Sequence, residues 1–178
     1  AASDVYKRQG GCQEDIDVNL VENVKKLCKY LKPKFKEYHD ILSSNRIFMN
    51  RFKGVGVLSK EDAISYGCTG GTGRATGWAN DVRKHHPYAM YDKVEFDEIT
   101  FTHGDSYDRY LVRMAELEQS VRILEQLIDN IPEGDFYIKQ KAVIRVPEGQ
   151  WYFSCEGSRG EIGVYLDSKG DCLLYTSD

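Results

Sequence analysis

The residues best suited to chemistry stand in one glycine-rich stretch, Gly67–Tyr91, which reads GCTGGTGRATGWANDVRKHHPYAMY. Glycine lets the backbone adopt turns with φ > 0 and lets another group approach the chain closely. The stretch lies between two segments with a helical pattern, so we expect a structured loop that meets a ligand or a partner. It lacks the phosphate-binding pattern GxxxxGK[ST] and follows no clear strand, which argues against a nucleotide site.

Two features within this stretch carry charge or can gain it. Arg74 stands among glycines that cannot cover its side chain. We therefore expect its guanidinium to pair with a carboxylate or with backbone carbonyls elsewhere, in this chain or in a partner. The pair His85-His86 has no further histidine or cysteine at metal-ligand spacing, so we expect two loop histidines and no metal site.

Acidic side chains follow in the second half of the chain. Asp105 is placed to favour the dipole at the start of a helix. Asp108, Arg109 and Arg113 have the spacing of ion pairs along that helix. Three further carboxylates are expected on its solvated or subunit-facing side and not as an acid/base pair: Glu116, Glu118 and Glu125.

A first long helix is predicted over residues 18–43, where apolar residues recur every three or four positions. Either Asp15 or Asp17 is available as its N-cap. Pro33 falls inside the pattern and is expected to kink the helix or split it in two. A short amphipathic segment over 46–52 follows.

A second long helix, with the same spacing, is predicted from 105 or 106 to Ile131, where Pro132-Glu-Gly134 ends it. Between the two long helices, Ser59–Asp62 has the form of a capping box that opens a short helix ending at Gly67. Residues 93–102 alternate loosely and are expected to be extended.

Beyond the second long helix the apolar period changes to two, as in strands. The expected strands are Ala142–Val146, Trp151–Cys155 and Ile162–Leu166. The predicted fold class is α+β: a central helical bundle with two long heptad-like helices, followed by a small antiparallel β meander.

The composition is that of a soluble globular domain. The chain has 178 residues, of which 41% are hydrophobic and 29% charged. A net charge of -4 argues against nucleic acid as the main partner. No apolar run approaches the roughly 20 residues of a membrane span. The cysteines form no CxxC pair, which is typical of scattered thiols in a reducing compartment.

The two ends of the sequence, Ala1–Gln9 and Cys172–Asp178, are interpreted as translations of one DNA element. A DNA string that encodes DVYKRQ encodes CLLYTS on its opposite strand. The element resembles a transposon end used in preparing sequencing libraries. We therefore set both ends aside from the fold prediction and expect residues 10–171 to be an internal fragment of a longer protein.

Four blocks of the sequence, taken in order, resemble the D-type subunit of bacterial NADH–quinone oxidoreductase, respiratory complex I. The mitochondrial counterpart of that subunit is the 49-kilodalton subunit. The second block looks most like the form in Bacteroidetes-type bacteria, where the C-type and D-type subunits are often fused. The blocks are NRIFMNRFKGVGVLSKEDAISYG (Asn45–Gly67), GGTGRATGWANDVRKHHPYAMYD (Gly70–Asp92), GDSYDRYLVRMAELEQSVRILEQ (Gly104–Gln126) and GSRGEIGVYLDSKGD (Gly157–Asp171).

This resemblance implies a peripheral subunit on the cytoplasmic side of the bacterial inner membrane. Its implied partners are the B-type subunit that carries the terminal iron–sulfur cluster, the C-type subunit and the H-type subunit of the membrane arm. Quinone, the substrate, would be reduced in the cleft beside the B-type subunit. Its electrons would come from NADH through FMN and iron–sulfur clusters, and the reaction would be coupled to proton translocation. This chain itself would bind no cofactor, because the cluster is supplied by the neighbouring subunit.

The resemblance also implies roles for particular residues. The quinone-ligating histidine and tyrosine of the family lie upstream of Gly10. The segment Gly10–Asp15, GGCQED, is similar to the one that ends in the family's chamber aspartate, so Asp15 is a candidate for the proton relay that follows quinone reduction. An aspartate that only caps a helix is the alternative. Gly10, Gly11 and Arg74 are expected in a quinone-site or subunit-interface loop, and no metal ligand is expected.

Two other functions stay open at this stage. The chain could belong to the large subunit of a related membrane-bound nickel–iron hydrogenase, whose CxxC pairs would lie outside this fragment. It could also be a helical interaction scaffold without chemistry. The fragment alone is expected to be inactive.

Overall fold

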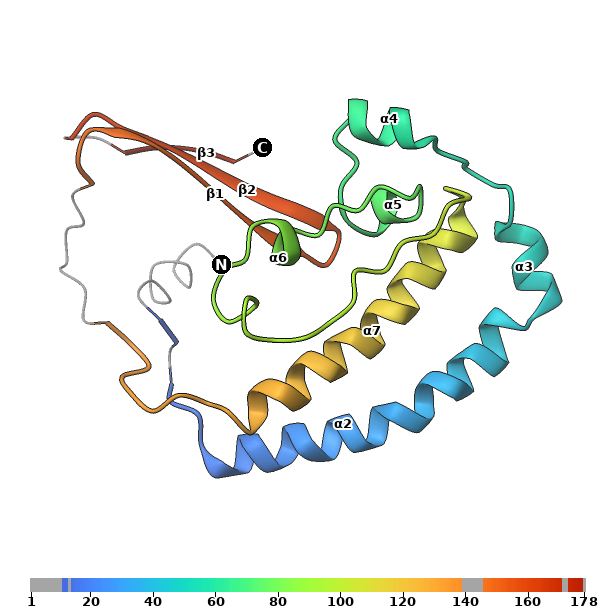
Figure 1. Cartoon of the computed structure of the whole chain (residues 1–178), viewed down its shortest axis with the longest axis horizontal. Helices are drawn as coiled ribbons and strands as arrows, with labels where there is room; N and C mark the ends of the chain where they lie inside the picture. The colour runs from blue at the N-terminus through green and yellow to red at the C-terminus, as the bar shows by residue number, and fades with distance from the viewer. Residues whose placement is uncertain (1–10, 13, 139–145, 171–172, 178) are drawn as a thin grey trace.

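Two long helices lie side by side along one edge of the molecule in the computed structural model, which describes residues 11–12, 14–138, 146–170 and 173–177 (Figure 1). Helix α2 (Val18–Tyr38) continues into one π-helical turn, η1 (His39–Ser43). Helix α7 (Ser106–Ile128) runs antiparallel to it, as the ion pairs Lys25–Asp129 (2.5 Å) and Lys32–Glu125 (2.7 Å) show.

The start of each long helix follows from an aspartate cap. The Asp17 carboxylate accepts a hydrogen bond from Leu20 N at 2.6 Å, so Asp17, and not Asp15, caps α2. The Asp105 carboxylate accepts one from Asp108 N at 2.8 Å at the start of α7. Of the two outcomes expected at Pro33, a kink or a split, the split does not occur, because α2 passes through this residue without interruption.

The two apolar stripes predicted from the sequence meet each other. Cys28 and Phe35 of α2 pack on Val121 of α7, and Val24 and Leu31 complete the cluster. Burial of such a stripe provides most of the stability of a helix pair in water. Helix α7 ends at Ile128, three residues before the predicted end, so Ile131 lies beyond it.

Between the long helices the chain forms four short helices: α3 (Arg46–Phe52), α4 (Lys60–Ser65), α5 (Gly70–Arg74) and α6 (Val82–His85). The predicted bounds of α3 are confirmed, and the Ser59 hydroxyl caps α4 by accepting a bond from Asp62 N at 3.0 Å. Gly67–Tyr91 was expected to be a loop, but it contains two of these helices and several buried residues.

The coil after α6 lies along the far side of α7 from α2. Val94 and Phe96 pack on Ile123 there. The Gln126 side chain accepts a hydrogen bond from Glu95 N at 2.8 Å and donates one to Glu95 O at 2.7 Å. The extended segment expected over 93–102 is therefore not part of a sheet, because side chains of α7 satisfy its backbone.

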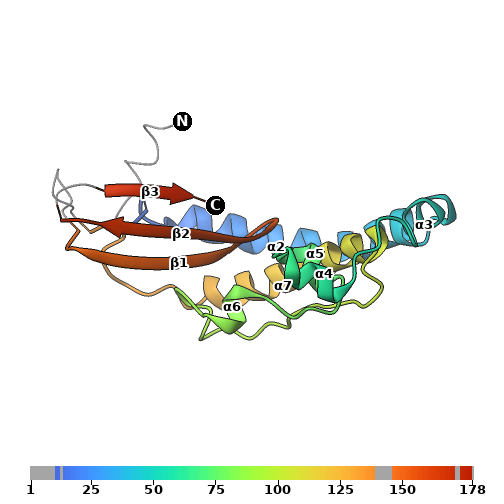
Figure 2. The same cartoon turned by 90° about the horizontal axis from the view of Figure 1, so that it is seen from above.

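A three-stranded antiparallel sheet of order β1-β2-β3 completes the described chain (Figure 2). Its strands are β1 (Gly149–Gly157), β2 (Gly160–Ser168) and β3 (Leu173–Ser177). The first two contain the predicted strands near 151 and 162. The predicted strand Ala142–Val146 lies outside the described residues except for Val146. Helices and an antiparallel sheet together confirm the α+β class.

Strand β3 falls within the C-terminal segment that the DNA argument set aside. It pairs along β2 from Leu173 opposite Ser168 to Ser177 opposite Val164. It therefore adds an edge strand to the β1–β2 hairpin. The interpretation of residues 1–9 and 172–178 as translated DNA elements stays a prediction.

Candidate functional site

The glycine-rich segment is held tightly between α7 and the β1–β2 hairpin. Gly70 has a φ of +68°, and a Cβ added there would lie 2.6 Å from Arg159 O. Gly71 faces α7, where an added Cβ would lie 3.7 Å from Val112 Cγ1. Gly70 combines left-handed backbone with a close backbone approach, which only glycine tolerates. The position therefore serves packing within this chain.

Arg74, at the end of α5, is the centre of a buried charge cluster. Its side chain is 3% exposed. Its Nε donates to Glu116 Oε1 of α7 at 2.7 Å, and its Nη1 donates to Glu156 Oε1 of β1 at 2.9 Å. Nη1 also lies 3.3 Å from the Asn80 carbonyl oxygen. One guanidinium thus connects α5, α7 and the hairpin.

Two carboxylates around a single guanidinium decide the electrostatics of this cluster. Burial by itself would lower the pKa of Arg74, but Glu116 and Glu156 outweigh it and raise the pKa above its ordinary value. The other oxygen of Glu156, Oε2, accepts from Val82 N at 3.3 Å. The cluster is therefore charged and hydrogen-bonded, as a buried ion pair must be to offset desolvation.

A second ion pair, between Asp81 and Arg83, borders the first. It is bidentate: Arg83 Nε lies 3.0 Å from Asp81 Oδ1, and Arg83 Nη2 lies 2.7 Å from Oδ2. Burial tends to raise the pKa of Asp81, but the bonds from Arg83 lower it below the ordinary value. The guanidinium carbon of Arg83 also lies 5.0 Å from the centre of the Phe96 ring, a cation–π distance.

The structure answers the question that the sequence left open for Arg74: both of its carboxylate partners belong to this chain. The expectation that Glu116 is solvated or faces another subunit is wrong, because its side chain is 23% exposed and bound to Arg74. The sequence reasoning missed Glu156. Its signal was a lone acidic residue within the otherwise uncharged strand sequence WYFSCE.

The ion pairs expected along the start of α7 do not form. Asp108 instead accepts two bonds from His103, from its backbone N at 2.8 Å and from Nδ1 at 3.1 Å. Arg109 donates to the carbonyl oxygens of Gly104 and Gly56, each at 2.8 Å. These side chains fasten the coil before α7 to the helix start.

The residues expected at the quinone site lie apart from Arg74. Gly11 forms an isolated antiparallel bridge with Tyr137, beyond the end of α7, while Gly10 lies outside the described residues. Asp15 is exposed, and its carboxylate accepts a bond from Ile16 N at 2.7 Å. Since the contacts of Arg74 are with Asn80, Glu116 and Glu156, the structure does not join Asp15 and Arg74 in one site.

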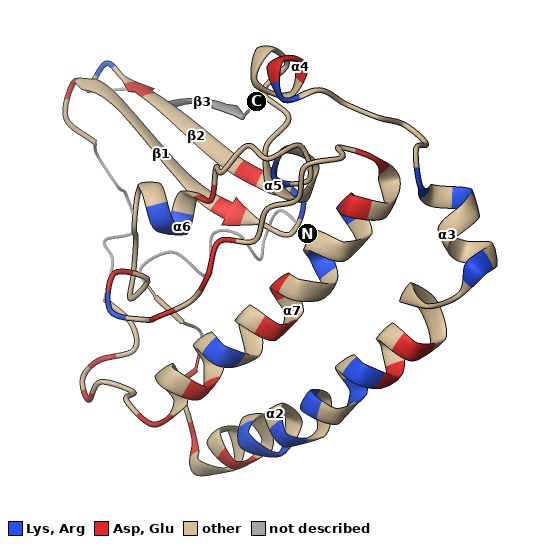
Figure 3. Ribbon diagram, turned by 45° about the vertical axis from the view of Figure 1, so that its right-hand side comes forward, with Lys and Arg blue, Asp and Glu red and all other residues tan. Residues whose placement is uncertain are grey.

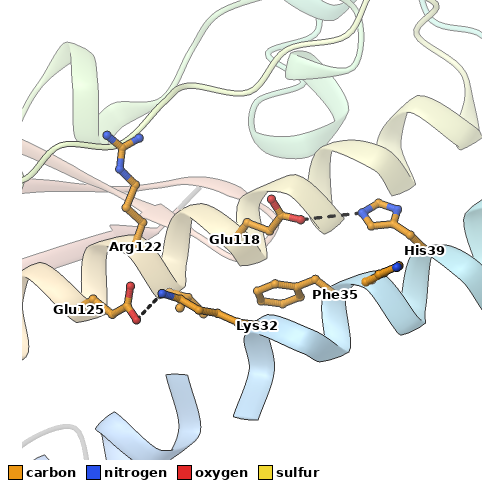
Figure 4. Close-up of a pocket in the computed structure, with 8 residues that line it drawn as sticks. Lys32, Phe35, His39, Glu118, Arg122 and Glu125 are labelled. Carbon is orange, nitrogen blue, oxygen red and sulfur yellow. Dashed lines mark ion pairs between the residues drawn. The ribbon is translucent and has the colours of Figure 1, made fainter. Parts of the chain in front are cut away.

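A groove of about 590 Å³ runs along the joint between α2 and α7 (Figure 4). Its apolar floor is Phe35 and Val121, and its rim carries the Lys32–Glu125 pair. At its η1 end, His39 Nε2 lies 4.0 Å from Glu118 Oε1, and His39 Nδ1 lies 2.8 Å from Ser43 Oγ. Because Lys32 and Glu125 neutralise each other across the two helices, we do not assign a ligand to this groove.

The described residues do not fit a metal or an iron–sulfur cluster. They contain no group of three or more His, Cys, Asp or Glu side chains that could hold a metal ion. The free cysteines are dispersed: Cys28 is in the α2–α7 core, whereas Cys12 is exposed. His85 Nε2 lies 3.4 Å from Glu98 Oε2.

Among the residues that the structure describes, no helix combines the length and apolar content that a membrane crossing requires.

A fold with this helix pair and hairpin is also found in a chain of a solved respiratory membrane complex. A chain in the structure of the membrane-bound sulfane sulfur reductase, an archaeal respiratory membrane complex, superposes with a TM-score of 0.85. The two chains are 35% identical, and the match covers 93% of this chain and 48% of the other.

The family model described as the 49 Kd subunit of respiratory-chain NADH dehydrogenase matches residues 3–145, and the chain belongs to this family. The C/D-type subunit of NADH-quinone oxidoreductase from Phocaeicola vulgatus is 59% identical over 96% of this chain, and that from Bacteroides thetaiotaomicron is 58% identical. The D-type subunit from Bacillus cytotoxicus is 42% identical over 93% of it. The resemblance to the D-type subunit, and to its fused C/D form, is confirmed.

The chain spans 33% of the length of the Phocaeicola vulgatus protein and 45% of the Bacillus cytotoxicus protein. None of these relatives is named as a nickel–iron hydrogenase, so they do not favour the hydrogenase alternative. They do not favour a scaffold without chemistry either, because each is named as a subunit of an oxidoreductase.

Proposed function

We propose that this chain is part of the peripheral arm of an NADH–quinone oxidoreductase and contributes to its quinone-reduction site. The observation that carries the proposal is the family match over residues 3–145, together with 59% identity to a C/D-type subunit of an NADH-quinone oxidoreductase. Electrons would pass from NADH through FMN and iron–sulfur clusters to quinone. The reaction would be coupled to proton translocation.

The electron donor in this proposal lies in another subunit. The described thiols do not form a cluster ligand set, and the family resemblance implies that the cluster next to the quinone would belong to a neighbouring B-type subunit. A C-type subunit and an H-type subunit of the membrane arm would be further partners. The assembly would lie on the cytoplasmic side of the inner membrane.

Within this function Asp15 is proposed as a proton-relay residue. Reduction of quinone to quinol consumes two protons, and a carboxylate can hold and deliver a proton at a defined position. Asp15 is not needed as the cap of α2, because Asp17 provides it. Its carboxylate is exposed in this chain, and the upstream histidine that the family resemblance implies would be its partner. Gly10 and Gly11 would carry the loop that aims it.

The test is Asp15→Asn in the assembled complex, with Glu14→Gln as a matched control on the neighbouring exposed acid. Loss of a positioned acid–base group lowers rates by about a hundredfold or more, so we expect NADH–quinone turnover to fall by about that factor. Glu14→Gln should leave turnover within about twofold of wild type. Equal turnover and equal pumping in both variants would remove Asp15 from the mechanism.

The function itself is tested by membranes of a strain that lacks the full-length gene. We expect NADH–quinone turnover to disappear and to return when the gene is restored. Unchanged turnover would contradict the proposal. The purified 178-residue chain should show no turnover, since its proposed electron donor is another subunit.

A further inference from the structure

A second, smaller pocket lies between the β1–β2 hairpin and the segment that joins α4 to α6. Its volume is about 440 Å³. It is separate from the Asp15 segment and from the α2–α7 groove, and its described lining residues belong to β1, β2 and the segment between α4 and α6. Its lining includes three aromatic side chains, one amide and one carboxylate: Trp78, Tyr152, Tyr165, Asn80 and Glu161.

The hairpin register explains why these groups share one face. Tyr152 pairs with Tyr165, and Glu156 pairs with Glu161, in the antiparallel ladder. Residues two apart on a strand point to the same side, so all four belong to one face of the hairpin. Gly163, between Glu161 and Tyr165, keeps this face open: a Cβ there would lie 2.9 Å from Tyr152 Cζ. The absent side chain lets the Tyr152 ring lie across β2.

The charges on this face are not balanced. Glu156 and Glu161 stand directly opposite each other in the ladder, and like charges in such a pair repel. Figure 3 shows acidic positions on the hairpin beside α5. Arg74 neutralises the charge of Glu156, with Arg74 Nη1 2.9 Å from Glu156 Oε1. Among the described residues Glu161 has no cation within 4.0 Å, and its carboxylate meets only the Tyr152 hydroxyl, at 3.4 Å. Its backbone is held in place, since Glu161 N donates to Thr69 Oγ1 at 3.0 Å.

We propose that this pocket receives an arginine side chain from a partner polypeptide. Within the described part of the chain the Glu161 carboxylate has no cationic partner, and it stands beside one tryptophan and two tyrosines. This setting matches a guanidinium, which both pairs with carboxylates and stacks on aromatic rings. Asn80 adds a polar group to the pocket lining. The proposal rests on the pocket alone and does not depend on the redox function proposed above.

The chain offers an internal control for a binding experiment, because one of its two tryptophans, Trp78, lines the pocket and the other, Trp151, does not. The indole N–H signals of both are followed by NMR while N-acetyl-arginine amide is added. We expect the Trp78 signal to shift in a saturable way and the Trp151 signal to stay in place. N-acetyl-citrulline amide, a neutral isostere, should bind about tenfold more weakly, a difference of about 1.4 kcal/mol.

Two variants separate this site from non-specific binding. Glu161→Gln should weaken arginine binding about tenfold, because the charge partner is lost while shape is kept. Glu133→Gln, which removes an exposed charge elsewhere, should leave binding unchanged. Equal affinity of wild type and Glu161→Gln, or equal affinity for arginine and citrulline amides, would overturn the proposal. N-acetyl-lysine amide that binds as tightly as the arginine amide would overturn the assignment to arginine.

Should Glu161→Gln fail to fold, as seen from collapse of the Trp151 signal to its random-coil position, Tyr165→Leu provides the second test. This change removes one aromatic wall at a position 40% exposed and leaves the charge in place. We expect it to weaken arginine binding about threefold to tenfold, the loss of one cation–π contact. Unchanged binding would contradict the aromatic part of the site.

Discussion

Arg74 and Glu156 stand 82 positions apart in the chain, yet Arg74 Nη1 lies 2.9 Å from Glu156 Oε1, and both side chains are at most 5% exposed. Glu116, 42 positions from Arg74, shares the same guanidinium. This contact fixes the hairpin to α7 through the glycine-rich segment. We therefore expect this contact to stabilise the folded chain.

Arg74→Ala should lower the free energy of unfolding by about 3–5 kcal/mol, because the buried Glu156 and the largely buried Glu116 lose their shared cation. Urea unfolding followed by circular dichroism measures this loss. Lys26→Ala provides the control. The Lys26–Glu22 pair is exposed to solvent and should contribute almost nothing to the free energy of unfolding. Similar losses in the two variants would show that Arg74 is not the centre of the cluster.

Gly70→Ala should destabilise the fold more than Gly67→Ala. Both glycines have a left-handed φ, +68° and +64°, which costs a residue with a side chain about 1–2 kcal/mol. A Cβ at Gly67 meets nothing within 4 Å, whereas one at Gly70 meets the hairpin backbone. The extra loss at Gly70 should be about 1–3 kcal/mol, the usual cost of overpacking. Equal shifts of the urea midpoint would show that strain alone acts at both sites.

Asp81 should contribute a pH-dependent part of the stability. Its folded pKa is lower than its ordinary value of 3.8, because Arg83 outweighs the effect of burial. A group with a lowered pKa stabilises the fold above its unfolded pKa and loses this effect as pH falls through the folded pKa. The stabilisation is therefore complete near neutral pH and fades below about pH 4.

Asp81→Asn should accordingly be less stable than wild type at pH 7 and should lose less stability on acidification to about pH 3. Urea midpoints measured in steps across this pH range give both slopes. Two parallel curves would mean that Asp81 titrates at the same pH in the folded and unfolded chain. That result would contradict the lowered pKa.

Phe35→Ala should cost about 3–5 kcal/mol, because it opens a cavity in the cluster that joins α2 to α7. Leu117→Ala is the matched control on the helix pair. Leu117 is 47% exposed, so its removal should change stability by no more than about 0.5 kcal/mol. Thermal unfolding of both variants distinguishes them. A small effect of Phe35→Ala would mean that the two helices pack without this contact.

Local features of the sequence predicted the elements well, because each depends on neighbours a few positions away. The spacing of apolar residues located α2 and α7, and Ser59 and Asp105 marked helix starts that their side chains do cap. The amphipathic segment predicted over 46–52 has the bounds of α3. The coil over 93–102 was harder, because the partners of its backbone are glutamine side chains of α7 and not a neighbouring strand.

For the candidate site, too, the sequence predicted what depends on local residues and not what depends on distant contacts. The residues of Gly70–Asp92 were sufficient to indicate the family, since a sequence signature needs no coordinates. The proximity of Gly11 to Tyr137 and the independence of Asp15 from Arg74 depend on how the helix ends are placed, so no pattern of spacing predicted them.

The sequence by itself determined the two helical stripes, the strand period and the family, because these are written in residue types and short intervals. Only the tertiary structure decided which carboxylates neutralise Arg74, why Gly70 must be glycine, and that Glu161 lines a pocket beside three aromatic rings. Ion pairing and close packing depend on distances of a few ångströms between residues far apart in the chain. Such distances exist only once the helix pair and the hairpin have folded against each other.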